Sequence, residues 1–246
     1  MESTSAAFHK DGAFYIESVV FQAGTTLFKV PVYYLPKGEG VFQDLLALPN
    51  HNKEGNGDSN PITLPAQITA EDFHSFLNFI MPAPIHVPPR KVTIPEWSSV
   101  FQLSSMWCLE VVRVKALADA DKQVIAVEDP VTLVLMGKDH HVARWLVEGY
   151  KRLCVNPQFL KREEQIKIGF ETVSRLAEIR ERSWKWASTA ETQHIHRYNA
   201  RNGVYTAGTV QVSTRDRLMY DFTRAIHQLF EDELLLDKTY VSPFRN

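Results

Sequence analysis

The sequence predicts a mixed α+β fold in which a short β-hairpin near the N-terminus is covered by helices. Residues 14–22 are dense in β-branched and aromatic side chains, which favour strands. Residues 26–30 form a second run of this kind after a short turn. Beyond residue 128 the apolar residues recur at helical spacing. A two-stranded hairpin is marginally stable at best in water, so the helices are needed to cover it.

The hairpin turn and the elements after it follow from local residues. Gly24 lies in the turn, where glycine can adopt the positive φ that a tight reversal needs. Residues 51–60 are rich in Gly, Asn and Asp and predict an exposed loop. Residues 61–65 predict a brief strand near an edge, because prolines flank it and cannot donate to a ladder. The helix expected between hairpin and loop is marked by Val41, Phe42, Leu45 and Leu46 and ends at Pro49.

Two helices with capping signals come next. Thr69 is the predicted N-cap of a helix that ends at Pro82. Thr93 is the predicted N-cap of a second helix, with Pro95 in its first turn, where proline is tolerated. A further helical segment is expected to extend to about Ala120.

The chain after residue 128 is predicted to be almost wholly helical. Residues 188–213 are the exception, and their Asn and Gly residues predict a loop with a short hairpin. Thr214 is the predicted N-cap of a last helix. The first predicted apolar stripe is formed by Val142, Trp145, Leu146 and Leu153, and the second by Ile166, Phe170, Val173 and Ala177. The last helix carries Leu218, Phe222, Ala225 and Leu229.

Residues 18–42 carry a resemblance to a known family. The stretch SVVFQAGTTLFKVPVYYL, with Val41 and Phe42 downstream, is similar to the opening of a BTB/POZ domain and most resembles the fungal BTB-domain proteins. The resemblance implies a short β-sheet covered by a cluster of α-helices, in the order strand, strand, helix, strand, helix and helical pair, followed by an α-helical extension. With the resemblance, we expect a BTB/POZ domain at 14–120 and a helical extension at 121–187. The small and polar residues at 1–13 predict a flexible N-terminal arm, and residues 188–246 are expected to form a loop and a C-terminal helix.

Composition and charge narrow the class of protein. The chain of 246 residues has a formal net charge of −2, which argues against a general nucleic-acid binder, because such proteins usually carry a strongly basic balance. Cys108 and Cys154 lie in apolar helical patterns and predict two buried free thiols, which suit a reducing compartment. The N-terminal residues lack a basic segment followed by an apolar run, and no apolar run approaches membrane-spanning length. We therefore expect a cytoplasmic or nuclear protein without a membrane segment or a signal peptide.

The sequence contains no Walker-type glycine loop, G-x-G-x-x-G, G-x-S-x-G or H-E-x-x-H motif. We therefore expect a protein that is not an enzyme and that holds no cofactor or metal. One alternative is a metal-binding enzyme that uses His194 and His196, which would share one face of a strand. Another is a nucleic-acid-associated transcriptional regulator that uses residues 180–186, where two tryptophans alternate with basic residues.

The remaining expectation is a surface that binds proteins. BTB domains self-associate through their first strand and first helices. The resemblance therefore implies a non-catalytic scaffold or adaptor that forms a homo-oligomer, expected to be a dimer, or binds another protein, or does both. Paired tyrosines suit interfaces, because each ring offers a large apolar area and one hydroxyl. The expected interface residues are Phe14, Ile16, Val32, Tyr33, Tyr34 and Leu35.

Departures from the family pattern limit what the resemblance implies. Ser18 stands where many members have an acidic residue, and Pro31 and Val32 replace a histidine and the basic residue after it. In the zinc-finger class this acid and base line a charged pocket, so corepressor binding is not implied here. Members that recruit a cullin scaffold use the helix predicted at 69–81 and the connection after it, and several carry an apolar-x-Glu element beyond. The connection at 82–92 contains no Glu, so the sequence does not support a role as a cullin-type ubiquitin ligase substrate adaptor. Only the resemblance leaves that role open.

Overall fold

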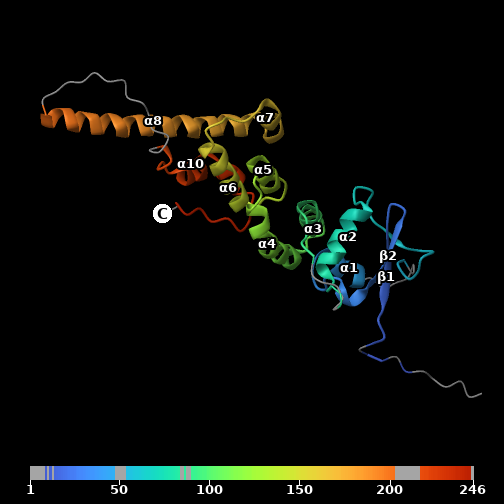
Figure 1. The fold of residues 1–246 in the computed structure, drawn as a ribbon. Coiled ribbons are helices and arrows are strands. Elements are labelled where there is room, and N and C mark those ends of the chain that lie inside the picture. The colour runs from blue at the N-terminus through green and yellow to red at the C-terminus, as the bar shows by residue number, and fades with distance from the viewer. Residues whose placement is uncertain are drawn as a thin grey trace, which may run out of the picture. The chain divides into compact units, whose positions relative to one another are not determined.

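The computed structural model describes residues 9, 11–12, 14–47, 54–83, 86, 90–202 and 217–244 (Figure 1). The side chains of residues 46–47 and 189–202 lie outside this description. The protein is α+β, and its described elements are β1 (Ser18–Ala23), β2 (Thr26–Pro31), the 3-10 helix η1 (Val32–Tyr34), α1 (Gly40–Ala47), β3 (Ile62–Thr63), α2 (Ala70–Ile80), α3 (Ile94–Met106), α4 (Glu110–Ile125), α5 (Pro130–Asp139), α6 (Ala143–Val155), α7 (Arg162–Ile168), α8 (Phe170–Asn202), α10 (Phe222–Leu229) and α11 (Glu231–Leu234).

The chain divides into two compact units, Met1–Asp121 and Lys122–Asn246. The division falls inside α4. The four parts expected at 1–13, 14–120, 121–187 and 188–246 stay a prediction.

β1 and β2 form the predicted antiparallel hairpin, with Phe21 opposite Phe28. Gly24 in the turn has a φ of 57°, as a tight reversal requires. β3 pairs in parallel with β1, where Phe21 lies opposite Ile62, and the sheet order is β2-β1-β3. The brief strand predicted between two prolines is therefore confirmed, and it lies at an edge of this sheet.

The first strand begins at Ser18 and not at residue 14, as the sequence predicted. The last pair of the hairpin joins Ser18 to Pro31, and proline has no N–H with which to extend the ladder. After Pro31 the chain turns into η1, so β2 ends there. Residues 14–17, which precede β1, therefore have no strand beside them in β2. Strand propensity alone could not locate this end.

Aromatic rings form the centre of the core in unit 1. Phe21 from β1 lies edge-on to Phe73 from α2, with ring centroids 5.3 Å apart. Trp107 lies edge-on to Phe42 at 5.3 Å and to Phe76 at 5.2 Å. Edge-to-face pairs of this kind are the favoured geometry, and all five rings are buried. The helices thus cover the hairpin as the sequence required.

Both predicted capping signals are confirmed. Thr69 accepts a hydrogen bond from the backbone of Asp72, and the Asp72 carboxylate accepts one from the backbone of Thr69. Thr93 and Glu96 form the same reciprocal box at the start of α3. Ser99 donates to Asp72 at 2.6 Å, which joins the first turn of α2 to the second turn of α3. Local sequence therefore fixed where these two helices begin.

Helices α5 and α6 pack closely at two glycines in unit 2. A Cβ atom on Gly137 would lie 2.8 Å from the side chain of Leu146, and one on Gly149 would lie 2.7 Å from Val134. Helix axes can approach this closely only where no side chain intervenes. α10 lies beside α6 and α8 (Figure 1), and buried residues from all of these helices form one apolar cluster.

The second predicted apolar stripe is wrong. Gly169 has a φ of 90° and separates α7 from α8, so the residues on either side do not continue one helical face. Ile166 and Phe170 are largely exposed, and Ala177 is also exposed. The face of α8 that is buried is formed by Thr172, Val173, Leu176, Ile179, Ser183 and Ala187.

The end of α8 also differs from the prediction. We expected a loop with a short hairpin at 188–213, but α8 continues to Asn202, and residues 203–216 lie outside the described part. Residues 188–198 contain neither glycine nor proline, so nothing in them forces a helix to end. The last long helix is capped by Asp221, whose carboxylate accepts a hydrogen bond from Arg224, while the predicted cap Thr214 lies outside the description. Leu218 precedes this helix and is exposed.

Across the described residues, none of the helices combines the length and the apolar character needed to cross a membrane.

Candidate functional site

The residues expected at an interface gather at one end of the hairpin in unit 1. The side chains of Phe14, Ile16 and Tyr33 are 86%, 61% and 74% exposed. Val32 and Tyr34 are half-buried. Leu35 is 2% exposed and belongs to the apolar core of this unit, so the expectation that it lies at the surface is wrong. The 3-10 turn at η1 redirects the chain and points Leu35 inward.

Backbone hydrogen bonds bring the two parts of this surface together. The N–H of Val32 donates to the carbonyl of Glu17 at 2.9 Å. Ile16 precedes Glu17 and Tyr33 follows Val32, so this bond brings Ile16 and Tyr33 close together. The rings of Tyr33 and Tyr34 pack edge-on with centroids 5.0 Å apart. We call Phe14, Tyr15, Ile16 and Tyr33 the hairpin-end surface.

Tyr15 is an exposed member of this surface that the sequence analysis did not single out. Strand alternation would have placed it opposite Phe14 and Ile16. Since residues 14–17 are not part of the strand, that alternation does not decide which of them is buried. All three consecutive apolar side chains are exposed.

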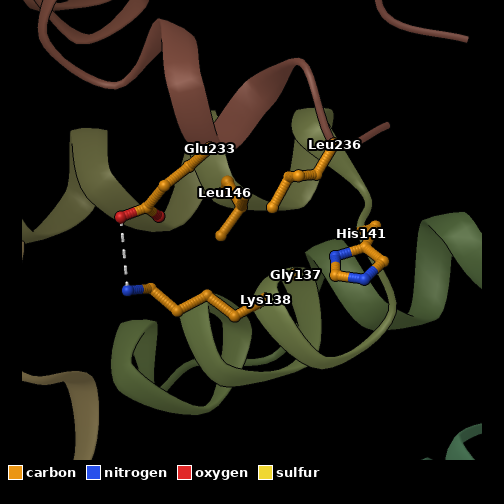
Figure 2. Close-up of a pocket in the computed structure, with 6 residues that line it drawn as sticks. All are labelled: Gly137, Lys138, His141, Leu146, Glu233 and Leu236. Carbon is orange, nitrogen blue, oxygen red and sulfur yellow. Dashed lines mark hydrogen bonds and ion pairs between the residues drawn. The ribbon is translucent and has the colours of Figure 1, made fainter. Parts of the chain in front are cut away.

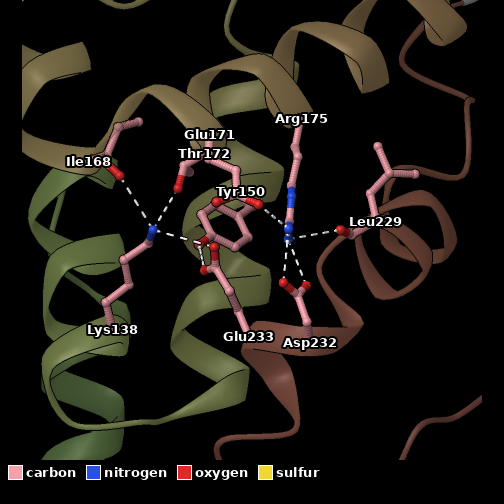
Figure 3. A network of polar contacts seen from close by, with 9 residues as sticks. All are labelled: Lys138, Tyr150, Ile168, Glu171, Thr172, Arg175, Leu229, Asp232 and Glu233. Atoms are coloured by element: carbon pink, nitrogen blue, oxygen red, sulfur yellow. Dashed lines mark hydrogen bonds and ion pairs between the residues drawn. The ribbon is translucent and has the colours of Figure 1, made fainter.

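A small hollow of about 230 Å³ opens in unit 2 beside α5, α6 and α11 (Figure 2). Leu146 and Leu236 point into it, and the ion pair between Lys138 and Glu233 closes one end. The His141 ring lies at the other end. The Lys138 amine and the Glu233 carboxylate are engaged by protein groups, as Figure 3 shows, so the charges here serve the fold.

Those charges belong to a polar network that ties the C-terminal helices to the rest of unit 2 (Figure 3). Lys138 donates to Thr172 and to the carbonyl of Ile168, and its amine lies 3.5 Å from Glu233. Tyr150 donates its hydroxyl proton to the other Glu233 oxygen. Burial, followed by the hydrogen bond to Glu233, raises the pKa of Tyr150 above its ordinary range, so this hydroxyl stays protonated.

A second ion pair lies next to this network. The guanidinium of Arg175 binds both oxygens of Asp232 and also donates to Glu171 and to the carbonyl of Leu229. The hydrogen bond to Asp232 raises the pKa of Arg175, and the same bond lowers the pKa of Asp232. Bidentate pairing of this kind fixes geometry as well as charge. The network therefore orients α11 on α5, α6 and α8.

The two cysteines lie in different surroundings. Cys154 is buried as predicted, and burial raises the pKa of its thiol to about 12, which makes it unreactive. Cys108 is exposed, and the prediction that it is buried is wrong. It lies just past the end of α3 with a φ of 55°, so its side chain leaves the apolar face of that helix.

The two histidines of the metal hypothesis lie on helix α8 and not on a strand. Their side chains lie outside the description. No cluster of three or more His, Cys, Asp or Glu side chains suited to a metal ion is found among the residues that the structure describes.

The basic residues at 180–185 on α8 are engaged within the protein. Arg182 pairs with Glu178 and Lys185 with Glu181, each one helical turn away. Arg180 donates to four backbone carbonyls in the last turn of α6 and just after it, including those of Leu153 and Pro157. These contacts favour a structural role for this face over nucleic-acid binding.

Comparison of the chain with protein-family models, with curated proteins and with solved structures finds no match.

Proposed function

We propose that this protein is a non-catalytic protein-interaction module, a scaffold or adaptor of the BTB type that self-associates through the hairpin-end surface. The element order of unit 1 supports the proposal, because strand, strand, helix, strand, helix and helical pair is the order that the resemblance implies. The sheet is small and covered by helices, as in that family.

The observation that carries the proposal is the exposure of Phe14, Tyr15 and Ile16 beside exposed Tyr33. Single exposed apolar residues are normal, but contiguous runs of them mark interaction sites. The three aromatic rings offer on the order of 400 Å² of exposed area, about half of what one partner buries in an interface of standard size. Neighbouring residues of the same domain would supply the remainder.

Replacing Tyr33 with Asp tests this surface directly. Tyr33 is exposed and Tyr34 is half-buried, so the single change avoids damage to the core. A carboxylate buried at the interface without a partner is expected to weaken self-association at least roughly tenfold. Sedimentation equilibrium should show the wild-type chain well above its monomer mass of 28.1 kDa, with Tyr33→Asp closer to it at low micromolar concentration.

The matched control is Val111→Asp, which adds the same charge at another exposed apolar position of unit 1, on α4. The apparent molar mass of this variant in sedimentation equilibrium should equal that of the wild type. A wild-type chain that stays monomeric at tens of micromolar would contradict self-association, and equal masses for wild type and Tyr33→Asp would contradict the hairpin-end surface.

Binding of another protein, and with it a cullin-adaptor role, stays a prediction. The connection that such adaptors use follows α2, and residues 84–85 and 87–89 of it lie outside the described part.

A further inference from the structure

The segment that carries the hairpin-end surface is held at both of its ends. Before it, the carboxylate of Asp11 accepts a hydrogen bond from the N–H of Phe14 at 2.8 Å, and the carbonyl of Asp11 accepts one from Tyr15 at 3.1 Å. After it, the carbonyl of Glu17 accepts from Val32 at 2.9 Å. Residues 14–17 therefore lie between two hydrogen-bonded points, although they belong to no strand.

The bonds to Asp11 have the pattern of a capped helical turn. A side-chain oxygen that accepts from the N–H three residues later is the usual N-cap contact, and Asp is among the residues that favour it. The carbonyl bond to Tyr15 spans four residues, like one turn of a helix. The turn thus sets the direction in which the exposed side chains of Phe14 and Tyr15 leave the chain.

Such a turn has an energetic consequence for association. A mobile arm that presents apolar side chains must be ordered when it binds, and the lost conformational entropy weakens the complex. A turn that already holds the arm lowers this cost before the partner arrives. The exposed rings by themselves would supply contact area but not this advantage.

We propose that Asp11 is a positioning residue for self-association: its carboxylate holds Phe14 and Tyr15 in place for the apolar surface of a second copy of this chain. The inference rests on the proposed function, because it concerns the same surface. The carboxylate acts as a hydrogen-bond acceptor at this turn, so an uncharged acceptor of the same shape preserves the effect.

Two variants of the full chain separate position from charge. Asp11→Ala removes the acceptor and is expected to raise the dissociation constant of the dimer about fivefold, the size expected for the loss of one cap. Asp11→Asn keeps an acceptor oxygen and loses the charge, and its dissociation constant should stay within about twofold of the wild type. Analytical ultracentrifugation over a concentration series measures all three dissociation constants. The unfolding temperatures of the three proteins should agree at concentrations where all are monomeric, because dimerisation itself raises the unfolding temperature.

Amide exchange reports the turn independently of assembly. The N–H of Phe14 should exchange faster in Asp11→Ala than in Asp11→Asn at concentrations where both are monomeric. Equal dissociation constants for the Ala and Asn variants would overturn the role of Asp11. If Tyr33→Asp weakens the dimer while Asp11→Ala does not, the proposed function stands and this inference fails; a monomeric wild type removes both.

Discussion

At the scale of single residues, two helices end on a non-glycine residue in the left-handed conformation. Cys108 follows α3 with a φ of 55°, and His141 follows α5 with a φ of 52°. In each case the N–H of this residue and the N–H of the residue after it bond to carbonyls in the last turn of the helix. At the end of α3, Cys108 donates to the carbonyl of Ser105, and Leu109 donates to that of Ser104. This is the Schellman arrangement, in which glycine is usual because it has no Cβ to strain.

We therefore expect Cys108→Gly to stabilise the protein by about 1 kcal/mol, the cost that a side chain adds in this conformation. The free energy of unfolding from urea titration measures the change. Cys108→Ala is the control, because it removes the thiol and keeps the Cβ, and its stability should match the wild type. A larger gain from Ala than from Gly would show that the thiol and not the backbone is responsible.

The same residue shows a limit of sequence patterns. Cys108 follows Trp107, which is buried, and precedes Leu109, which is buried as well. Its neighbours therefore predict burial, but the left-handed turn at the helix end directs its own side chain to solvent. Neighbouring residues predict burial only while a helix or strand continues through them.

At the scale of elements, the start of α3 depends on a charge. The hydrogen bond from Arg90, together with bonds from Thr93, lowers the pKa of Glu96 from its ordinary 4.5 to about 2. A carboxylate whose pKa is lowered by folding stabilises the folded state above its unfolded pKa. That stabilisation is lost as the pH falls through the interval from about 4.5 to about 2.

Glu96→Gln keeps a side chain that can close the capping box and removes the charge. We expect the wild-type protein to lose stability relative to this variant as the pH falls from 4.5 towards 2, and the two to differ little at the acid end. Thermal unfolding monitored by circular dichroism across this interval measures the difference. Because Arg90 is exposed, the difference at neutral pH should shrink in high salt. Parallel pH profiles for both proteins would refute the assignment.

The break between α7 and α8 shows why the apolar stripe predicted there is wrong. Apolar spacing predicts a continuous helix through residues 166–177, and it cannot detect that Gly169 rotates the chain between them. The residues that are buried on α8 include the polar Thr172 and Ser183, which have hydrogen-bond partners in Lys138 and in the buried Arg217. Polar residues in a core are invisible to an apolar pattern, since their burial depends on partners distant in sequence.

At the scale of the whole molecule, the C-terminal helices complete the core of unit 2. Phe222, Ile226, Phe230 and Leu234 are all buried in the same apolar cluster as α6 and α8. Phe230 stacks on Tyr150 with ring centroids 4.1 Å apart. Burial of four such side chains contributes about 6–12 kcal/mol, which is comparable to the entire stability of a typical domain.

Deletion of residues 217–246 is therefore expected to unfold unit 2 and to leave the sheet of unit 1 folded. Hydrogen exchange of the full-length and shortened chains measures both units at once: amides of α6 and α8 should lose protection, and those of β1 should keep it. A chain that ends after Tyr240 is the control, because it removes exposed Val241 and retains all four buried residues. Full protection of α6 in the longer deletion would contradict this account.

Features that depend on near neighbours could be predicted from residue order: the hairpin and its glycine turn, the brief third strand, and the capped starts of α2 and α3. The burial of Leu35, the exposure of Cys108 and the contact between Lys138 and Glu233, 95 residues apart, became visible only in the folded chain. Hydrogen bonds within one turn or one hairpin are fixed by local residue order, and so their signals can be recognised in a sequence. Burial and long-range ion pairs depend on which surfaces of the folded chain come together, and no short segment contains that information.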